Sequence, residues 1–119
     1  MQHLEPKQCH LWRKEDLNNS DLRLNNFEEL TVFTNSSHLT RKLLKCKDCG
    51  QLYFYEFYEE IDFIGGNDPQ YQTFIPVETE EKAKEISKED LLEIHNHSPR
   101  ILIDFPEEAE KPLLPRWVR

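Results

Sequence analysis

Stretches rich in β-branched and aromatic residues, separated by turn-forming residues, run through the first two thirds of the chain. They cover residues 29–34, 51–58 and 71–77, and each predicts a β-strand because such side chains pack well on a pleated surface. In residues 51–58 (QLYFYEFY) both faces of the strand would carry apolar side chains. A strand with one face in water would be polar on that face, so this strand is expected to be central in its sheet.

Residues 39–45 (LTRKLLK) fit two kinds of element. The three leucines have helical spacing and follow serines that can cap a helix, which favours a short helix. A strand is the better interpretation, because it would pair with residues 51–58 as an antiparallel hairpin through the turn between them. Residues 29–34 would then form a further hairpin with this strand.

Residues 80–95 carry the signals of a helix. Thr79 can cap its beginning, and Glu80 and Glu81 suit the positive end of the helix dipole. Residues 87–90 (SKED) form a second cap-like sequence, so the segment is either one helix or two short ones. The side chains expected to face the core are Ile86, Leu91, Leu92 and Ile94.

Residues 100–105 (RILIDF) predict a final strand, whereas the three prolines of residues 106–119 exclude a regular helix or a central strand there. A chain of 119 residues is long enough for one domain with a modest core. We therefore expect a single α+β domain over residues 1–105 and a proline-rich tail over residues 106–119. The domain would contain a small antiparallel sheet with a CxxC hairpin and one or two helices.

Two cysteines stand close together in Cys46-Lys47-Asp48-Cys49-Gly50, between two predicted strands. Their spacing lets both sulfurs reach one metal ion while backbone N–H groups of the turn face them. Gly50 can adopt the positive φ that such a turn needs. A redox pair is a second interpretation, although it usually stands at the start of a helix, and cysteines without a ligand are a third. The total of three cysteines is odd, which argues against a disulfide framework.

The turn and the strand after it resemble half of a zinc ribbon. The resemblance covers residues 39–58, and the second CxxC of a complete ribbon is absent. It implies a structural Zn²⁺ with four ligands, two of them Cys46 and Cys49. Cys9 is the natural third ligand, because the start of the strand at residues 29–34 would lie at the same end of the sheet. The fourth ligand stays open between His10, His38, His95, His97 and none of them.

The formal charge of the chain is −8, from 15 basic and 23 acidic residues. Such a field repels phosphate backbones and attracts basic partners, so nucleic acid is not the expected ligand. We expect a non-enzymatic, zinc-stabilised protein that binds a basic protein, in the manner of the bacterial immunity proteins or antitoxins that inhibit a basic toxin or nuclease. The residues expected to face this partner are Glu59, Glu60, Asp62 and Trp117.

A nucleic-acid or transcription accessory module is the alternative function, supported by the ribbon-like turn and by four neighbouring basic residues: Arg41, Lys42, Lys45 and Lys47. An enzymatic function rests only on an open metal position, since no set of catalytic residues stands out in the sequence. Glu56, the acid inside the aromatic strand, is interpreted as a salt-bridged or edge-exposed side chain rather than as a functional carboxylate in a low-polarity cleft. No stretch approaches the roughly 20 apolar residues of a membrane span and no secretory signal is recognisable, so a cytoplasmic location is expected.

Overall fold

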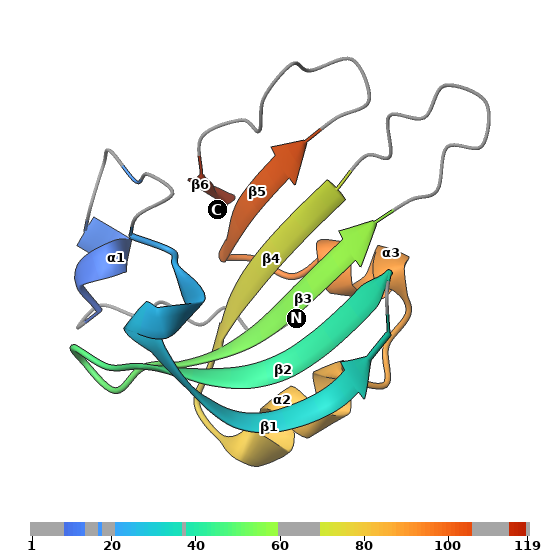
Figure 1. Ribbon diagram of the computed structural model, residues 1–119, viewed down its shortest axis with the longest axis horizontal. Coiled ribbons are helices and arrows are strands. Elements are labelled where there is room, and N and C mark those ends of the chain that lie inside the picture. The colour runs from blue at the N-terminus through green and yellow to red at the C-terminus, as the bar shows by residue number, and fades with distance from the viewer. Residues whose placement is uncertain are drawn as a thin grey trace.

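Six strands form one antiparallel sheet in the computed structural model, which describes residues 9–13, 17, 21–36, 38–59, 70–105 and 115–118. The order of the strands in space is their order in the chain (Figure 1). The strands are β1 (Phe27–Asn35), β2 (Leu39–Cys46), β3 (Leu52–Glu59), β4 (Gln70–Val77), β5 (Arg100–Phe105) and β6 (Arg116–Val118). The helices are α1 (His10–Arg13), the 3-10 turn η1 (Leu24–Asn26), α2 (Glu80–Ile86) and α3 (Leu91–His95).

The predicted antiparallel sheet and the small α+β architecture are confirmed, and residues 39–45 form a strand. The helical segment is divided into two short helices. The Thr79 hydroxyl accepts the N–H of Lys82 (3.1 Å) at the start of α2, and the Asp90 carboxylate accepts the N–H of Glu93 (2.8 Å) at the start of α3. Each cap satisfies an N–H that has no partner inside its helix. None of the helices in the described residues is long and apolar enough to cross a membrane.

One face of the sheet is covered by the N-terminal layer, by which we mean residues 9–13, 17 and 22. Tyr53 and Tyr55 of β3 and Phe74 of β4 are buried on this face and belong to one apolar cluster with Leu11 and Leu17. Aromatic side chains bury more apolar area than other residues, so they contribute much of the stability of this layer.

The opposite face of the sheet is covered by α2 and α3, which lie behind the curved sheet in Figure 1. Phe54 of β3 and Ile75 of β4 pack there against Ala83 and Ile86 of α2 and Ile94 of α3. β3 is therefore buried on both sides, as its doubly apolar pattern predicts: Tyr53, Phe54 and Tyr55 are core residues, whereas Phe57 and Tyr58 are half-buried.

Pro76 lies in β4, an inner strand, without interrupting the sheet. It stands opposite Tyr53 of β3, whereas the pairing of β4 with β5 already ends at Phe74 and Ile101. Proline cannot donate a ladder hydrogen bond, and at this position no neighbouring strand needs one from it.

The sequence did not predict α1 or β6, and these two elements meet. β6 lies within the predicted tail and extends the sheet as an edge strand beside β5. The indole N–H of Trp117 donates to the carbonyl oxygen of Leu11 (2.8 Å), and the Trp117 ring stands edge-on to Trp12 with centroids 4.8 Å apart. Residues near the two ends of the chain are therefore joined across one face of the sheet.

Tyr55 makes the stability of the protein sensitive to alkali. Its side chain is buried, its hydroxyl donates to the amide oxygen of Gln72 (3.1 Å), and burial raises the pKa of Tyr55 from 10.0 to about 12. The unfolded chain loses this proton at lower pH than the folded chain. The stabilising contribution is thus complete below pH 10.0 and is lost as the pH rises towards about 12, with an upper limit of about 3 kcal/mol.

We expect Tyr55→Phe to flatten this alkaline decline, measured as urea-unfolding free energy between about pH 9 and about pH 11.5. Tyr58→Phe is the matched control, because Tyr58 lies further along β3, half-buried and stacked on Tyr71. The control should keep the decline of the unmodified protein. Equal slopes in both variants would contradict the assignment to Tyr55.

Candidate metal centre

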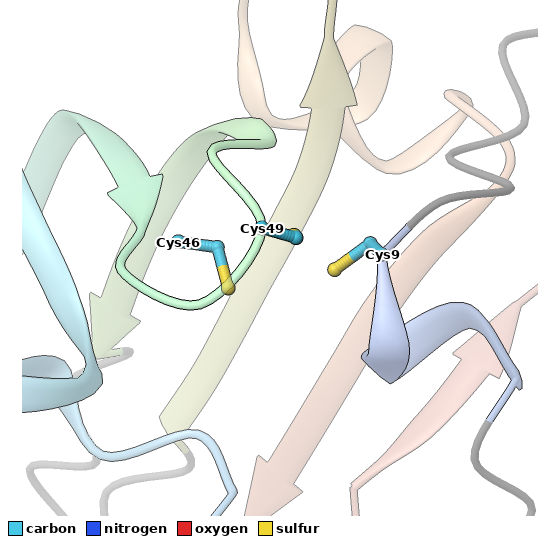
Figure 2. A group of neighbouring side chains, drawn as sticks. All are labelled: Cys9, Cys46 and Cys49. Carbon is cyan, nitrogen blue, oxygen red and sulfur yellow. The ribbon is translucent and has the colours of Figure 1, made fainter.

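Three cysteine side chains from two distant parts of the chain converge at one end of the sheet. The sulfur atoms of Cys9, Cys46 and Cys49 all lie within 4.8 Å of one another. Figure 2 shows Cys46 and Cys49 on the turn between β2 and β3, with Cys9 facing them from the start of α1. Cys9 and Cys46 are buried, Cys49 is exposed, and all three are free thiols. The structure thus brings together the three predicted metal ligands.

The turn between β2 and β3 holds its two cysteines through backbone geometry. The N–H of Gly50 donates to the carbonyl oxygen of Cys46 (2.8 Å). The N–H of Cys46 donates to the carbonyl oxygen of Gln51 (2.9 Å). Gly50 has φ of +80°, the positive value that the sequence predicts and that a side chain would strain. Burial raises the pKa of the Cys46 thiol, while backbone N–H groups of Cys49 and Asp48 at its sulfur act in the opposite direction.

Cys9 is held by the core rather than by the turn. Its carbonyl oxygen accepts the N–H of Trp12 (3.0 Å), and its sulfur accepts the hydroxyl of Tyr53 (2.9 Å). Burial raises the pKa of Cys9 to about 12, although the Tyr53 hydroxyl and the backbone N–H of Leu11 lower it. At neutral pH this thiol keeps its proton until a cation displaces it, so metal binding here would release protons.

The donor set fits a soft, tetrahedrally coordinated ion. Sulfur ligands about 2.3 Å from Zn²⁺ lie about 3.8 Å apart in a tetrahedron, so only small movements would bring these sulfurs onto one ion. Thiolates select Zn²⁺ over hard cations such as Mg²⁺ and Ca²⁺. Among the side chains that the structure describes, no further His, Cys, Asp or Glu joins the three cysteines. The side chain of His10 lies outside the described set.

The other three histidines considered as a fourth ligand lie elsewhere. His38 precedes β2 at the end of the strand opposite to Cys46, and its Nδ1 is 3.1 Å from a Glu59 carboxylate oxygen. His95 and His97 lie at α3, on the other face of the sheet from Cys9. The Nε2 of His95 is 3.6 Å from a carboxylate oxygen of Glu56, and the Nε2 of His97 is 2.6 Å from a carboxylate oxygen of Glu89. Each of these three histidines lies beside a carboxylate and not at the cysteine cluster.

Of the four residues expected to face a partner, the structure describes Glu59 and Trp117, and both are half-buried. Glu59 is half-buried and accepts a hydrogen bond from the amide of Gln70 (2.8 Å), besides its contact with His38. Trp117 is half-buried against the N-terminal layer, so the fold itself uses its ring. Glu60 and Asp62 lie outside the described residues.

Two of the four residues of the predicted basic patch pair with carboxylates, which weakens one of the two supports for a nucleic-acid-binding role. Arg41 is buried, with its Nε 2.9 Å from a Glu56 carboxylate oxygen, because β2 and β3 place these two residues directly opposite each other. The Nζ of Lys42 lies 2.6 Å from a carboxylate oxygen of Glu29. Of the four basic residues only Lys45 and Lys47 are exposed. Of the two placements expected for Glu56, the salt bridge is confirmed and the exposed edge is wrong, because Glu56 is buried in an inner strand.

The Arg41–Glu56 pair belongs to a network that sequence reasoning missed. The Arg41 Nη1 donates to the carbonyl oxygens of Ser87 and Glu89, both at 2.8 Å, and so ties the connection between α2 and α3 to the sheet. His95 approaches the second oxygen of Glu56. A signal existed in the sequence: counting back from the CxxC turn along the hairpin places residue 41 opposite residue 56.

Fold and site together define a small α+β protein with an antiparallel sheet and a three-cysteine cluster. Comparison with known protein families, with curated proteins and with solved structures finds no match. Its function is therefore inferred from its own residues.

Proposed function

We propose that this chain is a small acidic protein stabilised by a zinc site, and that it acts by binding a basic protein. The convergence of Cys9, Cys46 and Cys49 carries this proposal, because three sulfurs within 4.8 Å of one another form most of a zinc coordination shell. The CxxC turn would be a zinc knuckle of the ribbon type. Two of the three sulfurs are buried, which suits a structural ion better than a catalytic ion that must admit water or substrate.

A groove beside α2 offers a surface for the basic partner. Its cavity measures about 280 Å³. Among the residues that line it, Ile75, Val77 and Ile86 are buried, whereas Glu78, Glu81 and Glu85 are exposed. Lys82 also lines it, but its single positive charge is outnumbered by the three carboxylates, so the groove is negative overall. A lysine or arginine of the partner would lay its aliphatic stem on the buried apolar residues and its charged head among the carboxylates.

Charge and size support one kind of partner in particular. A net charge of −8 on 119 residues steers a cationic protein towards the chain over distances of about a Debye length. Bacterial immunity proteins and antitoxins that mask basic toxins or nucleases use complementarity of this kind, and the analogy rests on charge and size alone. The nucleic-acid alternative loses support, because Arg41 and Lys42 are engaged with Glu56 and Glu29.

Reversing the charge of the groove should weaken the binding of this partner. The test is affinity capture by the full chain and by Glu81→Lys/Glu85→Lys, followed by a titration of the captured basic protein against both. We expect at least about a tenfold loss of affinity, larger at low salt. Glu28→Lys/Glu93→Lys is the control, because it makes the same change of charge at exposed positions on β1 and α3. A partner that both double variants bind equally well would contradict the assignment to the groove.

A further inference from the structure

The three thiols of the cysteine cluster differ in their access to solvent. Cys9 is 1% exposed and Cys46 is 2% exposed, and both belong to the apolar cluster that includes the N-terminal layer. Cys49 is exposed, in a turn whose residues 47–50 all face solvent. Accessible thiols react with dissolved oxidants, whereas thiols buried in apolar surroundings are inert. Cys49 is therefore the sulfur that an oxidant meets first.

Two disulfide partners lie next to this exposed sulfur. The sulfur of Cys49 is within 4.8 Å of the sulfurs of both Cys9 and Cys46, and all three residues are free thiols. Figure 2 shows Cys9 facing the turn from α1, with Cys46 on the same turn as Cys49. A disulfide holds its sulfurs about 2 Å apart, so either bond needs an approach of at most about 3 Å. An accessible cysteine beside a second thiol is the arrangement found in redox-sensing proteins.

We propose that the cysteine cluster is a peroxide-sensitive switch, in which Cys49 is oxidised and then forms a disulfide with one of the two buried cysteines. The sulfur of Cys49 attacks one oxygen of hydrogen peroxide, the O–O bond breaks, one water leaves and Cys49 becomes a sulfenic acid. The thiol of Cys9 or Cys46 then displaces the hydroxyl group, which leaves as a second water. Each sulfur loses one electron, and the peroxide takes up both.

Oxidation and metal binding exclude each other at this cluster. A disulfide uses two of the three sulfurs, and the one that remains cannot hold a structural ion that needs four ligands. This regulatory consequence rests on the zinc site of the proposed function, whereas the disulfide itself needs only the three thiols. The identity of the partner matters for the fold: a bond from Cys49 to Cys9 joins the N-terminal layer to the turn, and a bond to Cys46 stays within the turn.

The test treats the full chain with hydrogen peroxide after removal of the reductant, both as purified and after incubation with a chelator. Intact-mass spectrometry should show a monomer that has lost two hydrogens, about 2 Da, and a dithiol should reverse the change. A 1,3-diketone that traps sulfenic acids should label Cys49 at least about tenfold more than Cys9 or Cys46. Peptide mapping assigns the disulfide partner, and a chromogenic indicator measures any zinc that the peroxide releases.

Cys49→Ser should slow disulfide formation at least about tenfold, because both remaining thiols are buried. Cys46→Ser is the matched control, since it also removes one thiol but keeps the exposed one and should react at nearly the rate of the unmodified chain. If either variant does not fold, the trapping of the unmodified chain decides alone.

Equal labelling of the three cysteines, a disulfide between two chains or no disulfide at all overturns the proposal. Its failure is distinguishable from that of the proposed function. A chain that carries zinc and keeps it in peroxide without forming a disulfide contradicts the switch alone. A chain without zinc that forms the disulfide contradicts the zinc site alone and supports the oxidation of Cys49.

Discussion

Purified under reducing conditions, the chain is expected to carry one zinc ion, and Cys46→Ser or Cys9→Ser should remove it. The reason is that the sulfurs of both residues, with that of Cys49, lie within 4.8 Å of one another, and a structural zinc needs all of its ligands. Elemental mass spectrometry gives the metal content. Structural zinc ions bind with apparent free energies of about 10–16 kcal/mol in zinc-finger peptides, so metal loss should lower the unfolding midpoint by more than about 10 °C.

Tyr53→Phe is the control for this experiment, because it removes the hydroxyl that contacts the Cys9 sulfur and leaves all three thiols in place. Loss of such an outer contact weakens metal affinity by about 10–100-fold, so the variant should still purify with zinc and lose it earlier to a chelator. Zinc retained by Cys9→Ser would contradict a site built from both parts of the chain. Absence of metal from the unmodified protein would contradict the zinc proposal itself.

Replacing Glu56 with alanine is expected to destabilise the protein by about 3–5 kcal/mol, since Arg41 would keep a buried charge without its carboxylate. Arg41 is 7% exposed and Glu56 is 1% exposed, so water cannot replace the missing partner. The connection between α2 and α3 should loosen as well, because Arg41 also holds the carbonyl oxygens of Ser87 and Glu89. Urea unfolding measures the first effect and amide hydrogen exchange the second.

The neighbouring pair of Lys42 and Glu29 supplies the control. Glu29 is half exposed, with a side-chain exposure of 50%, so Glu29→Gln should cost less than about 1 kcal/mol. The double variant Arg41→Met/Glu56→Leu should regain part of the loss of Glu56→Ala, because it leaves no unpaired charge. Similar losses in Glu29→Gln and Glu56→Ala would contradict a special role for the buried pair.

Strands and the CxxC turn were predictable because their signals are local. Residues 51–58 show by composition alone that both faces of β3 are covered, and Gly50 after Cys49 requires the positive φ that the structure has. The approach of Cys9 was also predictable, since the hairpin pairs Phe27 with Cys46 and so brings the N-terminal part of the chain to this end of the sheet.

The remaining features depend on contacts between distant residues. The local sequence around Trp117 is proline-rich and indicates a tail, and only the contacts with Leu11 and Trp12 explain an ordered strand there. Arg41 carries the same local signal as Lys45, and a carboxylate across the hairpin decides that one is buried and the other exposed.

Strand order has a consequence for the way the chain folds. Since each strand pairs with its neighbour in sequence, every hairpin closes a connection that is short compared with the whole chain, at a small entropic cost. The hydrogen bond from Trp117 to Leu11 joins residues 106 positions apart, so it contributes no stability until the sheet has formed. We therefore expect the sheet to assemble first and the segment with Cys9 to dock last. A metal ion held by all three cysteines would then stabilise the state reached in this last step of folding.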